Sequence, residues 1–410
     1  MTCRGPARAR RGAEQADLEV LDHAAVLVTD AGAIGAVGPL AELRQRDRGA
    51  RIHEIEGVLF PGFVDCHTHG VFGAARTADH ERRARGIGYK AIAAAGGGIL
   101  ASVGDVRQRT ETDLIDLTRR RLQHLLALGT TTVEVKSGYG LDLTTELKQL
   151  RVIRAVADVG PSLVPTFLGA HEVPLEYRDR PDEYVELVTR KMLPAVAQQG
   201  LARFCDIFCE PGVFTVAQSR RVLSAAVRHG FLLKIHADEL DGSGGAELAA
   251  ELGAVSADHL AAVSDEGIAA LARASTVAVL LPGTMLFLGQ RTQAPARRLI
   301  EAGAAVALAT DFNPGSSPGL SLPLMATVGV SQLRMLPAEA VIAITANAAA
   351  AIGEAHTRGQ IAPGFRADLT LVSVRDWREL MYWYGTNLVS EVWVQGTACH
   401  PREADLHFLV

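Results

Sequence analysis

Eight short apolar segments between residues 58 and 314 alternate with longer stretches of helical periodicity, and this alternation constrains the fold more than any other feature. The segments are continuous rather than alternating, which is typical of strands buried on both faces of a parallel sheet. Eight strand–helix units in about 250 residues match the size of a closed (β/α)₈ barrel. The strands are expected at residues 58–66, 98–103, 131–135, 163–169, 232–236, 254–257, 276–281 and 304–309.

The two flanks of the chain predict a second, smaller unit. Residues 25–29 and 34–37 form an expected hairpin around Asp30-Ala-Gly32, and residues 367–372 and 389–394 are expected strands. We therefore predict an α/β protein in which residues 58–361 form the barrel. Residues 1–57 and 362–410 are expected to build one discontinuous β-sandwich.

Charge and hydropathy exclude several classes of partner. The 410 residues contain 41 Lys and Arg against 46 Asp and Glu, a net charge of −5, which gives no electrostatic signal for nucleic acid or an anionic membrane. No apolar run approaches the roughly 18 residues of a membrane helix. A small-molecule partner is therefore expected.

Cysteine usage and the N-terminus indicate a cytoplasmic protein. Five cysteines are an odd number without paired spacing, so reduced thiols are expected. The first residues are rich in arginine, but the polar segment Gly12-Ala-Glu-Gln-Ala-Asp17 follows where a signal peptide would be apolar. We expect a ragged N-terminus rather than a targeting sequence.

A His-x-His pair closes the first expected barrel strand. His67 and His69 stand at positions i and i+2, which point to the same face of a strand and can reach one ion. His236 ends the fifth strand and Asp311 the eighth. A lone His or Asp at a strand end is more often a hydrogen-bonded cap, but four donors that meet at one barrel mouth favour a metal site.

Nitrogen and carboxylate ligands without a thiolate suit zinc or iron, and the donor set does not choose between them. A bridged pair of ions would need a further anionic ligand, for example a modified lysine at the end of the fourth expected strand, where the chain has His171. We therefore predict one ion. For Lys136, at the end of the third expected strand, a bridging role is less favoured than a salt bridge or a place beside the substrate.

Further polar residues at the strand ends are candidates for acid–base chemistry and for substrate binding. Glu239 is a candidate proton shuttle, or else a solvated loop residue, and His259 is expected to polarise a carbonyl or to pair with Asp258. Arg76 offers a bidentate fork for a carboxylate. The remaining pocket candidates are Tyr89, Tyr139, His171 and the turn Asn313-Pro-Gly315-Ser316-Ser317, whose N–H groups and hydroxyls can meet a ligand oxygen or simply form a turn.

Taken together, these segments resemble the amidohydrolase superfamily and, within it, the imidazolonepropionase family. The resemblance spans about residues 57–396. His-x-His is shared across the superfamily, whereas Lys136-Ser-Gly-Tyr-Gly and Thr310-Asp-Phe-Asn-Pro-Gly-Ser-Ser are more specific to the family. It is also carried by Pro61-Gly-Phe-Val-Asp-Cys-His-Thr-His, Ala95-Gly-Gly-Gly-Ile, Thr166-Phe-Leu-Gly-Ala-His, Lys234-Ile-His-Ala-Asp-Glu and Ser256-Ala-Asp-His-Leu.

The resemblance implies a fold, a cofactor and a reaction. The fold is a (β/α)₈ barrel with a β-sandwich, in a homodimer, and the reaction is hydrolysis of 4-imidazolone-5-propanoate to N-formimidoyl-L-glutamate by a metal-activated water. One zinc or iron ion is implied at His67, His69, His236 and Asp311. Asp311, Glu239 and His259 are expected to handle protons and charge. The substrate residues are expected to be Arg76, Tyr89, Tyr139, His171, Glu239 and Ser316, with Asn313 and Gly315 near the product.

Two other functions compete with this hypothesis, and two residues depart from the family pattern. A metal-dependent aminohydrolase would use the same ligands and release ammonia, and a non-catalytic scaffold would have lost them. Gly70 stands where the family commonly has a larger aliphatic residue, and Glu172 where a small residue is usual. Both changes bear on the volume and charge of the pocket.

Overall fold

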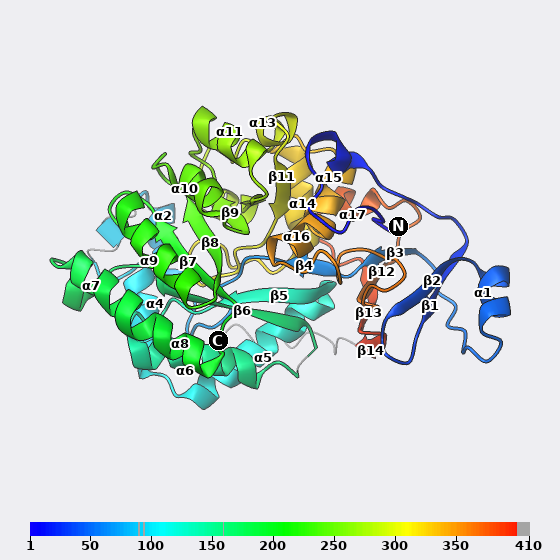
Figure 1. Ribbon diagram of the computed structural model, residues 1–410, viewed down its shortest axis with the longest axis horizontal. Helices are drawn as coiled ribbons and strands as arrows, with labels where there is room; N and C mark the ends of the chain where they lie inside the picture. The colour runs from blue at the N-terminus through cyan, green and yellow to red at the C-terminus, as the bar shows by residue number, and fades with distance from the viewer. Residues whose placement is uncertain (89–90, 93–94, 159, 400–410) are drawn as a thin grey trace.

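A parallel eight-stranded sheet forms the centre of the computed structural model, which describes residues 1–88, 91–92, 95–158 and 160–399 (Figure 1). Neighbouring strands follow one another in chain order. The predicted (β/α)₈ barrel is confirmed. Its strands are β4 (Phe63–Asp65), β5 (Thr130–Lys136), β6 (Ser162–Ala170), β7 (Phe204–Cys209), β8 (Leu232–Ala237), β9 (Ser256–His259), β10 (Val277–Leu280) and β11 (Ala305–Leu308).

Helices cover the outside of this sheet (Figure 1). The early ones are α2 (Thr77–Ala84), α4 (Ile99–Gln108), α5 (Glu111–Ala127), α6 (Leu143–Ala155), η2 (Leu175–Tyr177), α7 (Pro181–Leu187), η3 (Val188–Met192) and α8 (Leu193–Gln199). The later ones are α9 (Val216–Arg228), α10 (Gly245–Leu252), α11 (Asp265–Arg273), α12 (Pro282–Phe287), α13 (Ala296–Glu301), α14 (Leu322–Ser331), α15 (Pro337–Ala343), α16 (Ala346–Ala351) and α17 (Glu379–Tyr382).

One predicted barrel strand is wrong and one real strand was missed. Residues 98–103 begin helix α4, whose buried Ser102, Val103 and Val106 follow helical spacing. A short apolar run does not separate a strand from a buried helix turn. The missed strand is β7, whose apolar run is interrupted by Asp206. The false strand lies before β7 and the missed strand is β7 itself, so the strands numbered fifth and eighth in the prediction are also the fifth and eighth of the barrel. Between the two errors the numbering shifts by one: Lys136 ends the second barrel strand, and His171 follows the third.

The first predicted strand, residues 58–66, is divided between two sheets at Gly62. Residues Val58–Pro61 form β3, which pairs with β12 outside the barrel, and the chain enters the barrel as β4. The Gly62 N–H donates to Asp368 O at 2.8 Å, and the next N–H, of Phe63, donates to Gly129 O at 3.1 Å. Gly62 is therefore the point where the backbone changes partners.

The barrel closes at the segments that carry the predicted metal ligands. Thr68 and Phe312 form a parallel bridge between the chain beyond β4 and the chain beyond β11. The His69 N–H donates to Phe312 O at 2.8 Å, and the Asp311 N–H donates to His67 O at 3.1 Å. Closure of the sheet thus places the first and last predicted ligand segments side by side.

The outer unit is built from both ends of the chain, as predicted. It comprises an antiparallel sheet in the order β14-β13-β12-β3 and a β1–β2 hairpin, with helix α1 after the hairpin (Figure 1). The Ala33–Arg366 bridge joins hairpin and sheet, and Ile34, Ile361, Ala367 and Leu369 form their shared core. The bounds are β1 (Ala24–Val28), β2 (Ile34–Pro39), α1 (Leu40–Arg46), β12 (Leu369–Val372), β13 (Val389–Val394) and β14 (Thr397–Cys399). The domain boundaries at 57/58 and 361/362 stay a prediction, and β3 pairs with the outer sheet.

The N-terminal segment, expected to be ragged, packs against the barrel. Arg10 is buried, and its backbone N–H donates to Asn347 Oδ1 at 2.7 Å. Gln15, in the short 3₁₀ helix η1 (Gly12–Ala16), exchanges two hydrogen bonds with the backbone of Val306 in β11. The side-chain amide of Gln15 thus binds the backbone N–H and C=O groups of Val306, which the short strand β4 does not reach.

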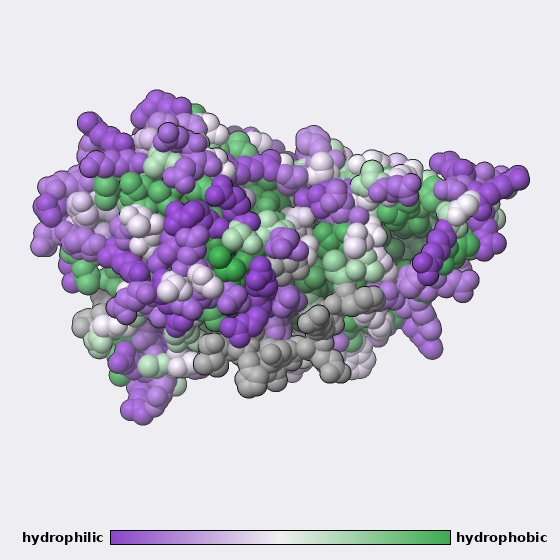
Figure 2. Space-filling model, turned by 90° about the horizontal axis from the view of Figure 1, so that it is seen from below, coloured by the Kyte–Doolittle hydropathy of each residue, from purple (hydrophilic) through white to green (hydrophobic). Residues whose placement is uncertain are grey.

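Among the described residues, no helix combines the length and apolar character needed to cross a membrane. On the face seen in Figure 2, hydrophilic and hydrophobic residues are interspersed.

Replacement of Gly62 by alanine is expected to destabilise the protein. A Cβ at Gly62 would lie 2.2 Å from Oγ1 and 2.5 Å from Cγ2 of Thr131. Overpacking of this kind lowers the free energy of unfolding by about 1–3 kcal/mol, which chemical denaturation measures. Gly104→Ala in helix α4, where a Cβ meets nothing within 4 Å, is the control and should be neutral or stabilising. Equal denaturation midpoints for the two variants would contradict the role given to Gly62.

Candidate active site

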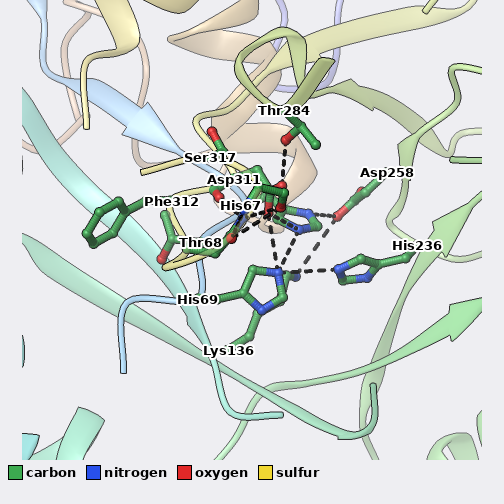
Figure 3. A network of polar contacts seen from close by, with 12 residues as sticks. His67, Thr68, His69, Lys136, His236, Asp258, Thr284, Asp311, Phe312 and Ser317 are labelled. Carbon is green, nitrogen blue, oxygen red and sulfur yellow. Dashed lines mark hydrogen bonds and ion pairs between the residues drawn. The ribbon is translucent and has the colours of Figure 1, made fainter. Parts of the chain in front are cut away.

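Four predicted ligands converge at the carboxyl-terminal mouth of the barrel (Figure 3). His67 and His69 lie in the extended segment after β4, His236 lies in β8, and Asp311 follows β11. All four side chains are buried. The structure therefore brings together residues that are far apart in the sequence, as expected of loops at the same end of a barrel.

Four of the distances among these donors match the spacing of ligands around one tetrahedral ion. His69 Nε2 lies 3.3 Å from His67 Nε2 and 3.4 Å from His236 Nε2. Asp311 Oδ1 lies 3.4 Å from His69 Nε2 and 3.5 Å from His67 Nε2. Ligands bound about 2.1 Å from one tetrahedral zinc ion would be about 3.4 Å apart. His67, His69 and Asp311 form a group that could hold one metal ion, and His236 lies beside this group against His69.

Hydrogen-bonding side chains on neighbouring elements orient these ligands. His67 Nδ1 lies 2.6 Å from Asp258 Oδ2, and His236 Nδ1 lies 3.1 Å from Asp206 Oδ2. A carboxylate at Nδ1 favours the tautomer that leaves the Nε2 lone pair for a metal. The Thr284 hydroxyl, in α12, donates to Asp311 Oδ2 at 2.6 Å and leaves Oδ1 to face the histidines. The predicted pairing of Asp258 with His259 is wrong, because Asp258 contacts His67.

A buried lysine connects these carboxylates beneath the ligands. Lys136 Nζ lies 2.8 Å from Glu134 Oε1, 2.8 Å from Asp206 Oδ2 and 4.0 Å from Asp258 Oδ2. Burial alone would lower the pKa of Lys136, but Asp206, Glu134 and Asp258 raise it above its usual value. Lys136 is therefore a buried cation in an ion-pair network, which is the salt-bridge alternative of the prediction.

Burial favours the neutral form of four imidazoles at the site. It lowers the pKa of His67, His69 and His259 well below 6.5, and that of His171 to about 3. Neighbouring histidines and the Lys136 charge contribute to these shifts. Neutral imidazoles are the form that binds a metal ion.

Three groups at the mouth are suited to hold or move protons. Burial raises the pKa of Asp311 to about 6, and burial with the nearby Asp311 and Glu210 raises that of Glu239 well above its usual value. His259 Nδ1 lies 3.5 Å from Glu239 Oε2. Asp311 and His259 adopt φ angles of 52° and 82°, a left-handed conformation that is strained for residues with a Cβ.

Arg76 presents a partly buried cation, whose Nε lies 3.9 Å from Asp79 Oδ2. Its side chain is 12% exposed, and its Nε and Nη1 atoms are buried without a hydrogen-bond acceptor. The guanidinium lies against Gly315, where a Cβ would come within 1.2 Å of Arg76 Nη2. Such a group can bind an anion with two hydrogen bonds, and Gly315 is needed to leave room for it.

The turn after Asp311 satisfies its own backbone. Asn313 Oδ1 accepts hydrogen bonds from the N–H groups of Gly315 and Ser316, at 2.8 and 2.7 Å, and Asn313 Nδ2 donates to Asp311 O at 2.7 Å. In this arrangement Asn313 accepts the N–H groups of Gly315 and Ser316, as in the turn alternative, and the predicted roles of Asn313, Gly315 and Ser316 in ligand binding stay predictions. The Ser316 hydroxyl also contacts Asn313, as donor to Oδ1 at 3.2 Å and acceptor from Nδ2 at 2.9 Å.

His171 and Tyr139 line the same space beside His69. The His171 ring stacks on the His69 ring at 4.9 Å, and its Nδ1 lies 3.0 Å from Gly138 O, so Nε2 faces away from that bond. The buried Tyr139 ring lies 6.0 Å from His69 and 5.5 Å from His171. Tyr89 lies outside the described residues, and its predicted role stays a prediction.

The two departures from the family pattern lie near this site. A Cβ on Gly70 would meet only ordinary contacts, the nearest being Val135 Cγ1 at 3.8 Å. Glu172 accepts a hydrogen bond from the Val173 N–H at 2.9 Å, and burial raises the pKa of its carboxyl. Together with Arg178, Glu172 lines a cavity of about 440 Å³ whose described lining includes none of the predicted metal ligands.

Sequence reasoning missed the residues that support the ligands. Asp206, Glu134 and Thr284 were not singled out, although each contacts a ligand or the lysine beneath it. A charged residue inside an apolar run, as in Phe204-Cys-Asp-Ile-Phe-Cys, was the available signal for Asp206. Thr284 follows a strand end without any distinguishing pattern.

Comparison with known proteins places the chain in a family. Residues 58–399 match the model described as the amidohydrolase family. The imidazolonepropionase of Symbiobacterium thermophilum is 49% identical over 393 residues, which covers 94% of this chain and 92% of that protein. The imidazolonepropionase of Geobacillus kaustophilus is 48% identical over 380 residues, covering 91% and 89%.

Solved structures share the fold at low sequence identity. Ochratoxinase from A. niger aligns with a TM-score of 0.70 and 19% identity, covering 93% of this chain and 92% of that one. 5-Methylcytosine deaminase from Klebsiella pneumoniae, liganded with 5-fluorocytosine, aligns with a TM-score of 0.70 and 17% identity, covering 92% and 94%. At this identity the likeness supports the barrel architecture alone.

Replacement of Asp258 by asparagine is expected to weaken metal binding. The change removes the carboxylate that orients His67, and loss of such a partner typically lowers metal affinity about 10- to 100-fold. Competition with a chromophoric chelator measures the dissociation constant. Asp265→Asn on the surface, where the side chain is 80% exposed, is the matched control. An unchanged dissociation constant for Asp258→Asn would contradict the orienting role.

Proposed function

We propose, from the premise that the chain belongs to the amidohydrolase family and within it to the imidazolonepropionases, that its site opens the ring of 4-imidazolone-5-propanoate by hydrolysis to N-formimidoyl-L-glutamate. One observation carries this proposal. Three imidazoles and a carboxylate at metal-ligand distances share the barrel mouth with Arg76, a partly buried guanidinium whose Nε and Nη1 atoms lack hydrogen-bond acceptors. The barrel mouth thus combines ligands for a hydrolytic metal ion with a cationic group that can bind the substrate's propionate.

His67, His69, His236 and Asp311 would hold the ion. A bound zinc or iron ion supplies Lewis acidity, polarising a carbonyl and lowering the pKa of water. The donor set contains nitrogen and oxygen only, which suits either metal. Elemental analysis of the purified protein distinguishes them.

Asp311 and Glu239 divide the proton transfers. Because Asp311 has a pKa of about 6, its carboxyl is mostly ionised at neutral pH and can accept a proton from the attacking water. Burial and the nearby Asp311 and Glu210 raise the pKa of Glu239, which favours the protonated carboxyl that can deliver a proton to the departing ring nitrogen. Water adds to the lactam carbonyl, the C–N bond breaks, and the nitrogen leaves as part of the formimidoyl group.

Neutral His259 would stabilise the carbonyl oxygen as charge develops on it. A hydrogen-bond donor held in a buried site before the reaction contributes more than one in water. Arg76 would bind the propionate, while His171 and Tyr139 would line the ring. The family relation also supports the proposed homodimer, which sedimentation analysis checks directly.

The product analysis tests this function. Purified, metal-quantified protein should consume imidazolonepropionate, followed by ultraviolet absorbance, and form N-formimidoyl-L-glutamate without ammonia. Ammonia released from a heterocycle would instead indicate an aminohydrolase. No turnover by the fully metal-loaded protein would reject this substrate.

Two substitutions separate binding from catalysis. Arg76→Met should raise KM about 10- to 100-fold with a smaller change in kcat, because it removes a charged contact to the propionate. Asp311→Ala should lower kcat by about 10²-fold or more, because it removes both a metal ligand and a proton acceptor. Arg85→Met, at an exposed arginine of the same region, is the control for Arg76. Equal, mild effects of both changes would refute this division of roles.

A further inference from the structure

The loop between His69 and Arg76 is held by side chains from three helices. Arg121 of α5 donates to Gly70 O, Phe72 O and Gly73 O at 3.2, 2.5 and 2.8 Å. Gln149 of α6 donates to Val71 O at 2.9 Å. Four consecutive carbonyls of this loop therefore have buried side-chain donors.

Helix α4 and the turn after Asp311 fix the rest of the loop. Asp105 Oδ2 accepts the Ala74 N–H at 2.9 Å, and the Arg76 N–H donates to Pro314 O at 3.1 Å. Gly73 is required here, because a Cβ would lie 1.5 Å from Asp105 Oδ2. The carbonyls of residues 70–73 and the N–H groups of Ala74 and Arg76 therefore all have hydrogen-bond partners.

Arg121 is the unusual member of this arrangement. Its side chain is buried, and within the described residues no carboxylate oxygen lies within 4.0 Å of its guanidinium. Burial lowers its pKa to about 9, so it is still charged at neutral pH. A buried charge is costly unless its hydrogen bonds are satisfied. The loop carbonyls and the Phe72 ring, whose centroid lies 3.5 Å away, are the groups that satisfy it.

The same contact extends to the metal-ligand segment. Phe72 lies against Phe312, with ring centroids 5.5 Å apart. Phe312 follows Asp311, and its carbonyl accepts the His69 N–H at 2.8 Å. Arg121 therefore packs against Phe72, Phe72 packs against Phe312, and Phe312 belongs to the turn whose Pro314 carbonyl binds the Arg76 N–H.

We propose that Arg121 is a positioning residue for the substrate carboxylate: by binding the carbonyls of Gly70, Phe72 and Gly73, it holds the loop so that the Arg76 guanidinium lies over Gly315. This inference rests on the proposed function, in which Arg76 binds the propionate. Arg121 itself touches no reacting atom. Its effect reaches the substrate through the loop backbone.

The kinetic arm of the test compares Arg121→Met, Arg121→Lys and Arg119→Met in the metal-loaded full-length protein. Arg121→Met should raise KM for imidazolonepropionate about tenfold or more, change kcat less than about threefold, and leave bound metal unchanged. Arg121→Lys retains a charge but loses the planar fork, so it should raise KM less. Arg119→Met, a partly exposed arginine on the same helix, should behave as wild type.

The exchange arm measures backbone amide hydrogen exchange without substrate. The Ala74 and Arg76 amides are hydrogen-bonded in the native loop and should exchange faster in both Arg121 variants, while those of helix α5 should not. A fall in kcat and metal content with unchanged KM would overturn the inference, and so would unchanged exchange at residues 70–76. If Arg121→Met fails to fold, the KM and exchange of Arg121→Lys decide. Failure of the wild-type protein to consume the substrate, in contrast, rejects the proposed function, and the exchange arm still decides whether Arg121 holds the loop.

Discussion

The ammonium group of Lys136 is the buried charge on which the architecture of the site depends. It lies between the carboxylates of Glu134 and Asp206, and Asp206 in turn orients His236. Without a cation at this place, buried carboxylates would repel one another, and removal of one partner from such a network is strongly destabilising. Counted with Asp258, Asp311 and Lys234, the four carboxylates and two ammonium groups carry a formal charge of −2. A divalent ion among the ligands brings this network to neutrality.

The segments that close the barrel also carry metal ligands. The hydrogen bonds that join the first and last strands are made by His67, His69, Asp311 and Phe312, so the ligand segments are themselves part of the seam. Gly62 lets the chain pass from the outer sheet into the barrel just before this seam. The pairing of β3 with the outer sheet therefore fixes where strand β4, which leads to the first ligands, begins.

The sequence alone predicted the barrel, the two-ended outer unit and the four donors, because each depends on local pattern. Continuous apolar runs identify buried strands, and polar residues directly after them are found at the mouth. The pattern failed where a charge lies inside a strand, as Asp206 does in β7, and where a short apolar run belongs to a helix, as in α4. It could not reveal the partner of Asp258, which is 191 positions away in the sequence, or the acceptors of Arg121, which are 48 to 51 positions away. Such pairings depend on how the strands and helices pack.

X-ray absorption spectroscopy of the metal-loaded protein determines whether the site holds one ion through nitrogen and oxygen ligands. We expect about one ion per chain, surrounded by three imidazoles and carboxylate or water oxygen, with nitrogen and oxygen ligands at about 2.0–2.2 Å. We also expect no sulfur ligand, because Cys66, Cys205 and Cys209 are buried free thiols outside the ligand cluster, and no second metal, because Lys136 occupies the space between the supporting carboxylates as a cation. A metal–sulfur distance of about 2.3 Å, or scattering from a second metal about 3.5–4 Å away, would contradict this expectation.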